Sequence, residues 1–196
     1  QTGEYQATYF YSFNVTRPPF DDARVRRALC LAVDREAIAR DLLKGTRRAW
    51  GNFVPSGYPG YEAPPPQRFD PDEARRELAR AGYPEGRGFP TFTLLFNTSE
   101  DHRRIAEAVQ AMWRRELNLP VELRNMENAS LVSALNTLTY DVARRSWIGD
   151  YLDPTTFLGV MYSRSGSNRT GWSDPRYDAL LRDAGRERDA AKRLAM

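Results

Sequence analysis

Short apolar runs alternate along this chain with longer segments that carry apolar residues on one side only. Four runs rich in aromatic and β-branched residues are predicted to form strands: 7–15, 91–96, 120–124 and 140–147. Between the second and third runs, apolar residues recur every three or four positions from Ile105 to Trp113, which predicts a helix with one buried face. A shorter helix is predicted at 129–135. From residue 91 onward the order is strand, helix, strand, helix, strand, which predicts an α/β fold with an open, mostly parallel sheet flanked by helices.

Capping residues mark further helices. Asp21 or Asp22 can cap a helix that runs through Val33, and Asp34 can cap a second that runs through Leu43 and stops at Gly45. Another helix is predicted at 71–81, with Asp70 as its cap, and others at 154–161 and from 174 onward. The tail 186–196 has a helical composition with little apolar face. Residues 50–67 are rich in Gly, Pro and aromatics, which is typical of an ordered irregular loop within a domain. We therefore expect 1–196 to form a single lobe.

Composition narrows the class of protein. With 41% hydrophobic and 28% charged residues, the chain is typical of a globular domain. No stretch approaches the roughly 20 apolar residues that span a bilayer. The net charge is +3, but the basic pairs are dispersed among acidic residues, so the pattern favours solvated helix faces over a nucleic-acid partner.

Few residues are available for catalysis. The chain has one histidine, His102, and one cysteine, Cys30, which lies in an apolar helical stretch and is expected to be an inert buried thiol. Catalytic triads, zinc sites and a Walker-type phosphate loop are therefore not predicted. Paired carboxylates such as Asp150 with Asp153 leave acid–base chemistry as an alternative, although helix capping and ligand binding explain such pairs better. We expect no enzyme activity, no metal and no cofactor.

Ligands of open parallel sheets collect beyond the carboxyl ends of the strands. That rule selects the turn after Phe96, where His102 enters a helix, and the exit of the strand 140–147. Because side chains alternate along a strand, Arg144 and Ser146 are expected on one face and Trp147 on the other.

Several segments together resemble one protein family: Pro18 to Leu29, Ala32 to Glu36, Leu78 to Pro84, Trp147 to Tyr151, Asp153 to Leu158 and Asn168 to Trp172. They are similar to the family 5 extracellular solute-binding proteins, the peptide and nickel receptors of ABC importers. The resemblance implies a periplasmic-binding-protein type II lobe. It also implies that the chain is most of the C-terminal lobe of a two-lobed receptor whose N-terminal lobe lies outside it.

The resemblance further implies the partners and the location. The expected partners are a short peptide ligand, the membrane permease subunits of the importer and the missing lobe of the same protein. No nucleic-acid partner is expected. The receptor is expected in the periplasm or outside the cell, and a lipidated N-terminus beyond this chain is compatible with that location.

The resemblance also assigns roles to individual residues. Asp150 matches an aspartate that pairs with the peptide's α-ammonium group. Arg144 and His102 match residues that meet the ligand's C-terminal carboxylate. Main-chain groups near Ser146 and Ile148, followed by Gly149, match those that bond the peptide backbone, and Trp147 would line a side-chain pocket.

Plainer interpretations of these residues stay open. Asp150 could be a surface or capping residue, Arg144 a structural ion-pair partner and His102 a cap. Trp147 could be a core residue, and Tyr151 and Trp172 are expected in the core. Two positions depart from the best-known oligopeptide receptors, with Asn128 in place of a pocket tryptophan and Leu135 in place of a carboxylate-binding arginine. A same-family receptor for a dipeptide, a nickel chelate, an opine or an oligosaccharide is therefore the main alternative.

Overall fold

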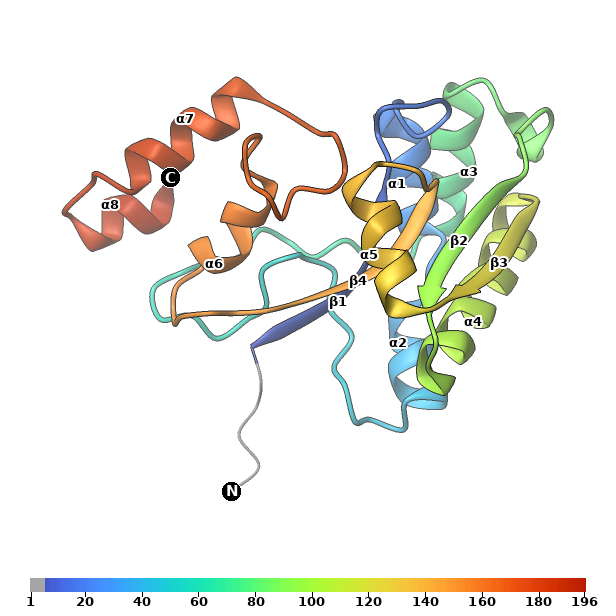
Figure 1. Ribbon diagram of the computed structural model, residues 1–196, viewed down its shortest axis with the longest axis horizontal. Coiled ribbons are helices and arrows are strands. Elements are labelled where there is room, and N and C mark those ends of the chain that lie inside the picture. The colour runs from blue at the N-terminus through green and yellow to red at the C-terminus, as the bar shows by residue number, and fades with distance from the viewer. Residues whose placement is uncertain (1–5) are drawn as a thin grey trace.

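A four-stranded sheet organises the computed structural model, which describes residues 6–196 (Figure 1). The strands are β1 Ala7–Phe13, β2 Phe92–Asn97, β3 Val121–Met126 and β4 Val142–Ile148, in the order β1-β4-β2-β3. β2 runs parallel to both β3 and β4, whereas β1 lies antiparallel to β4 at the edge. The mostly parallel sheet predicted from the sequence is confirmed, with one antiparallel strand added.

The helices are α1 Ala23–Leu31, α2 Arg35–Ala37, α3 Pro71–Arg80, α4 Glu100–Leu117, α5 Asn128–Asn136, α6 Thr155–Leu158, α7 Pro175–Ala184 and α8 Ala190–Ala195. Short 3₁₀ turns lie at Pro84–Gly86 and Gly159–Met161. Asp22 and Asp70 accept hydrogen bonds from main-chain N–H groups at the start of α1 and α3, as the capping analysis predicted. Between Leu42 and Pro71 the chain forms no helix or strand.

One predicted helix differs from the structure. Asp34 caps α2, but α2 passes at once into a π-helical turn at Ile38–Leu42 instead of continuing as an α-helix through Leu43. The Leu43 N–H donates to the carbonyl of Ile38, five residues earlier, at 3.0 Å. The widened turn holds an extra residue that no capping or periodicity rule signals.

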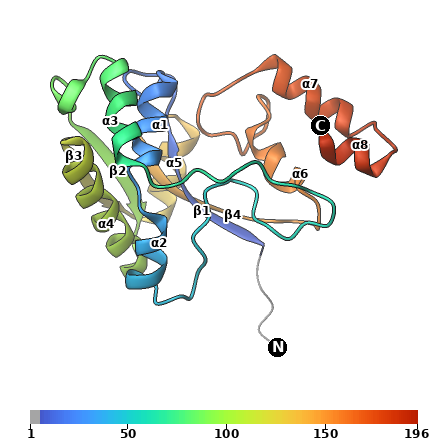
Figure 2. The ribbon, with the colours of Figure 1, turned by 180° about the vertical axis from the view of Figure 1, so that it is seen from behind.

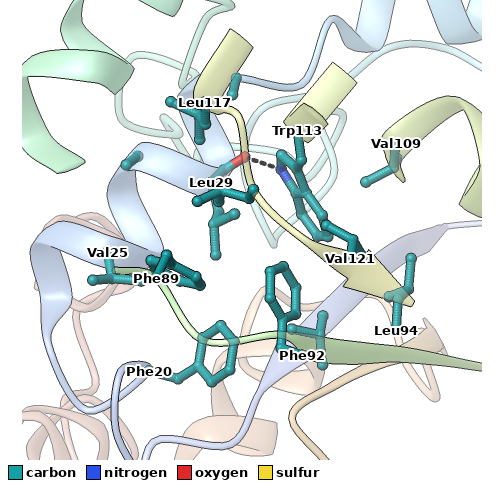
Figure 3. Close-up of a cluster of buried hydrophobic side chains, with 14 of the residues drawn as sticks. Phe20, Val25, Leu29, Phe89, Phe92, Leu94, Val109, Trp113, Leu117 and Val121 are labelled. Carbon is teal, nitrogen blue, oxygen red and sulfur yellow. Dashed lines mark hydrogen bonds between the residues drawn. The ribbon is translucent and has the colours of Figure 1, made fainter. Parts of the chain in front are cut away.

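The larger core lies on the sheet face covered by α1, α3 and α4 (Figure 2). Phe20, Phe89 and Phe92 pack there edge to face, and Phe92 contacts the buried Trp113 of α4. The Trp113 indole N–H donates to the Leu29 carbonyl at 2.8 Å (Figure 3). This bond satisfies the one polar group of the largest buried side chain and ties α4 to α1.

The opposite face carries two smaller clusters. Leu95, Leu131 and Ala143 belong to the first, beneath α5, and Val54 and Phe157 belong to the second, where the loop 50–67 meets α6. Arg145 lies on β4 between Ala143 and Trp147, on the same face, and is only 7% exposed. Its guanidinium donates to the Ser167 carbonyl at 2.8 Å, so a polar group separates the two clusters.

The C-terminal helices α7 and α8 stand away from the sheet, beside α6 (Figure 1). Arg193 of α8 donates to the carboxylate of Asp153. The ring of Trp172 packs edge to face on that of Tyr177, with the ring centroids 5.2 Å apart. The tail, which the sequence showed to be poor in apolar residues, is thus held partly by an ion pair. Among residues 6–196, no helix is long and apolar enough to cross a membrane.

Candidate functional site

The carboxyl ends of β2, β3 and β4 meet at one edge of the sheet because these strands run parallel. β4 pairs with β2 only at Val142 and Ala143, whereas its pairing with β1 continues to Ile148. Beyond Ala143 the two strands diverge (Figure 1). The edge of β4 from Arg144 to Ile148 that faces the β2 side therefore has no strand partner within the described chain. Such an edge offers main-chain N–H and C=O groups to an extended ligand.

The carboxylate of Asp150 lies just past the end of this edge. The Asp150 N–H donates to Thr156 Oγ1 at 2.9 Å, and the preceding Gly149 N–H donates to the Gln6 carbonyl at 2.8 Å. These bonds hold the turn, while the Asp150 side chain is exposed and has no hydrogen bond or ion pair with residues 6–196. The neighbouring Asp153 differs, because the Arg193 guanidinium and the Thr155 hydroxyl lower the pKa of Asp153 to about 2.

Gly149 makes the turn possible. A Cβ at this position would lie 3.0 Å from the Tyr58 hydroxyl, 3.2 Å from Thr156 Cγ2 and 3.3 Å from Phe157 Cε2. The strand exit therefore rests directly on the cluster formed by the loop 50–67 and α6. A glycine is required here by close approach rather than by its φ angle.

Trp147 and Tyr151 differ in their surroundings. Trp147 packs against the cluster of Val54 and Phe157, and its indole N–H is buried without a hydrogen-bond partner in the described chain. Tyr151 was expected in the core, but it is 54% exposed, and Leu152 is 87% exposed. That expectation was wrong because the chain turns outward after Ile148, and Phe157 supplies the buried aromatic instead.

The basic end of the edge is built around Arg144. Its guanidinium stacks on the ring of Tyr9, 4.8 Å from the centroid, and donates to Asn97 Oδ1 at 3.2 Å and to Ser146 Oγ at 3.3 Å. The Nε–H of Arg144 is buried without a partner. No carboxylate pairs with Arg144 within residues 6–196, so the structural ion-pair interpretation finds no acid to support it.

His102 lies in the first turn of α4, next to the same tyrosine. Its ring centroid is 5.6 Å from that of Tyr9, and its Nδ1 is buried without a hydrogen-bond partner in the described chain. Burial lowers the pKa of His102 below 6.5, and the nearby charges of Arg144 and Arg47 lower it further, against a weaker opposing effect of Asp101. The imidazole is therefore mostly neutral at pH 7.

Several residues of this cluster were not singled out from the sequence. Arg47, on the loop after the π-helical turn, stacks on the Tyr9 ring at 5.7 Å, and Tyr11 contacts Tyr9 edge to face at 5.9 Å. Burial raises the pKa of the Tyr9 phenol above its ordinary value. The alternation of β1 puts Tyr9 and Tyr11 on one face, which is a usable signal, but nothing in the sequence relates Arg47 to β1.

The two positions that depart from better-known receptors, Asn128 and Leu135, lie in different surroundings. Asn128 is the first residue of α5 and is exposed just beyond the carboxyl end of β3. Leu135, where better-known receptors carry an arginine, is 4% exposed in the apolar cluster beneath α5. Leu135 therefore belongs to the core and offers nothing to a ligand.

The structure brings most of the predicted residues to one edge. Arg144, Ser146, Trp147, Ile148, Gly149 and Asp150 follow one another along β4 and its exit, and His102 joins them from α4. Arg144 and Ser146 share the face of Tyr9, while Trp147 points to the other face, as strand alternation predicted. Within residues 6–196, no group of three or more potential metal ligands occurs.

Comparison with known proteins adds to this geometry. Residues 1–169 match the profile described as bacterial extracellular solute-binding proteins, family 5 Middle. The chain belongs to this family. The fold that the sequence resemblance implied is confirmed by solved structures of an oligopeptide-binding protein and of a murein tripeptide-binding protein, each with a TM-score of 0.90.

One curated relative is the periplasmic murein peptide-binding protein MppA of Escherichia coli, 37% identical over 196 residues, which cover 96% of this chain and 36% of MppA. Another is the probable deoxycholate-binding periplasmic protein YgiS of Escherichia coli, 35% identical, covering 95% of this chain and 36% of YgiS. A crystal structure of Haemophilus influenzae OppA in complex with RPPGFSPFR is 30% identical, with a TM-score of 0.89, covering 97% of this chain and 39% of that one. The family 5 chain thus spans little more than a third of the length of these proteins.

Proposed function

We propose that this family 5 chain is the ligand-binding C-terminal lobe of a receptor that delivers short peptides to an ABC importer in the periplasm or at the cell surface. The receptor binds the peptide between this lobe and the rest of the polypeptide and carries out no chemistry on it. Its further partners are the permease subunits of the importer. Binding peptides in this way uses the groups that every peptide has, namely its backbone and its two charged ends.

One observation carries the proposal. Within residues 6–196, an unpaired strand edge has a carboxylate without a partner at one end and a guanidinium without an acidic partner at the other. A zwitterionic peptide presents the complementary charges in the complementary order. Six positions separate Arg144 from Asp150, and an extended chain rises about 3.3 Å per residue, so their Cα atoms are at most roughly 20 Å apart. After allowance for both side chains, an extended peptide of about three to five residues fits between them.

A second candidate is a same-family receptor for another solute, which the name of the relative YgiS favours. The carboxylate of Asp150 argues against a solute without an ammonium group. Closing the second lobe over the site would bury this carboxylate without a partner, and burying an unpaired charge costs several kcal/mol.

The proposal is tested by substituting Asp150→Asn in the receptor that contains both lobes. The substitution removes the charge and keeps the shape, so we expect peptide affinity to fall at least tenfold, or about 1.4 kcal/mol, by isothermal titration calorimetry. Asp183→Asn is the matched control, because Asp183 is an exposed carboxylate on α7, away from the site. Unchanged affinity in Asp150→Asn, or an equal loss in the control, would contradict the proposal.

A further inference from the structure

Two guanidinium groups share one tyrosine ring at the basic end of the site. Arg144 lies 4.8 Å and Arg47 lies 5.7 Å from the centroid of Tyr9, and the ring of His102 lies 5.6 Å from it. The three basic side chains come from β4, from the loop after the π-helical turn and from α4. They therefore converge in space although they are far apart in the sequence.

Within residues 6–196, no carboxylate forms an ion pair with either of these arginines. Among residues 6–196, neither Arg47 nor Arg144 forms an ion pair, in contrast to most arginines on α3 and α4, which bridge to nearby glutamates or aspartates. Asp101 is an acid that acts on His102, and its influence is weaker than that of either arginine. At neutral pH the cluster thus carries two positive charges that no acid within residues 6–196 pairs with.

The cluster also holds polar atoms that have no partner in the described chain. These are the Arg144 Nε–H and the His102 Nδ1, both buried. Buried polar groups without hydrogen bonds are costly, so in proteins they are completed by ordered water or by a bound group. Donors gathered around two cations are suited to carboxylate oxygens, which accept several hydrogen bonds at once.

The charge count sets the class of ligand. The C-terminal carboxylate of a peptide carries a single negative charge, which compensates only one of the two arginines. Building on the proposed function, we infer that Arg47 receives a second carboxylate, so that the receptor prefers peptides whose last residue is acidic. Arg47 is exposed and reaches the Tyr9 ring from the loop after the π-helical turn. Its guanidinium is therefore accessible to the side chain of the last peptide residue.

The inference is tested with two peptides that differ only in the charge of the last side chain, Ala-Ala-Ala-Glu and Ala-Ala-Ala-Gln. In the receptor that contains both lobes, we expect calorimetry to give at least about tenfold tighter binding of the peptide ending in Glu. Arg47→Gln should reduce that preference to about twofold or less, and should leave the affinity for the peptide ending in Gln nearly unchanged. Raising the ionic strength should also weaken the preference, since an exposed charge pair is screened by salt.

Arg164→Gln is the matched control, because Arg164 is another exposed arginine on a loop, outside the cluster. It should retain the wild-type preference for Glu. Equal binding of the two peptides by the wild-type receptor would overturn the inference while leaving the proposed function intact. An equal loss of affinity for both peptides in Arg47→Gln would overturn it as well. Failure of the wild-type receptor to bind either peptide would instead contradict the proposed function.

Discussion

The two ends of the candidate site rest on different parts of the lobe. The basic end, around Arg144 and His102, lies against the face with the large continuous core of α1, α3 and α4. The acidic end, at Asp150, is supported by the small cluster of Val54, Tyr58 and Phe157 and by single hydrogen bonds. We therefore expect the large core to hold the guanidinium rigidly, and the carboxylate to be displaced more easily, without unfolding of the sheet.

The largest expected effect concerns the large core. Trp113→Ala removes a fully buried indole and leaves the Leu29 carbonyl without its donor, so the free energy of unfolding should fall by about 3–5 kcal/mol. Urea denaturation measures this loss.

Phe157→Ala, in the small cluster, should increase hydrogen exchange mainly at residues 53–61 and 147–158. Increased exchange throughout the sheet in Phe157→Ala would mean that the large core and the small cluster do not act independently.

A smaller effect is expected where β4 leaves the sheet. Gly149→Ala places a methyl group against Tyr58, Thr156 and Phe157, and relieving such overpacking costs about 1–3 kcal/mol. The shift should move Asp150 and weaken peptide binding, as measured by calorimetry. Gly159→Ala is the control, since a Cβ there meets nothing within 4 Å. Full peptide affinity in Gly149→Ala would show that the position of Asp150 tolerates displacement.

The smallest effect is the pH dependence contributed by His102. Its folded-state pKa lies below the ordinary 6.5, so the unfolded chain binds this proton more readily than the folded one. The contribution to stability is full above pH 6.5 and is lost as the pH falls from 6.5 toward the lowered value. His102→Gln should therefore show a smaller drop in Tm between pH 7.5 and 5 than the wild type, as measured by calorimetry. An unchanged drop would mean that other groups account for it.

Much of the scaffold follows from local rules. The four strands, the caps at Asp22, Asp34 and Asp70 and the parallel pairing of β2 with β4 are all predictable, because capping and alternation involve residues close in sequence. Their carboxyl ends then define the edge at which Arg144 and Asp150 lie. The family resemblance adds their expected roles, which stay predictions until they are measured.

The remainder depends on contacts that no local pattern encodes. The π-helical turn at Ile38–Leu42 and the loop that follows it bring Arg47 to Tyr9, across a separation of nearly forty residues. Tyr151 was expected to be buried because it is aromatic, but the chain leaves the sheet just before it. The geometry of the turn at Gly149, not side-chain hydrophobicity, decides its exposure.

The unpaired edge of β4 also bears on how a receptor of this kind can change over generations. The hydrogen-bonding groups on that edge belong to the main chain, so no replacement of Ser146 or Ile148 other than by proline removes them. Under the proposed function, substitution at surrounding positions such as Asn128 leaves these main-chain hydrogen bonds to an extended ligand in place. A change in ligand selectivity would then require new side chains around the site, while the main-chain groups of β4 stay the same.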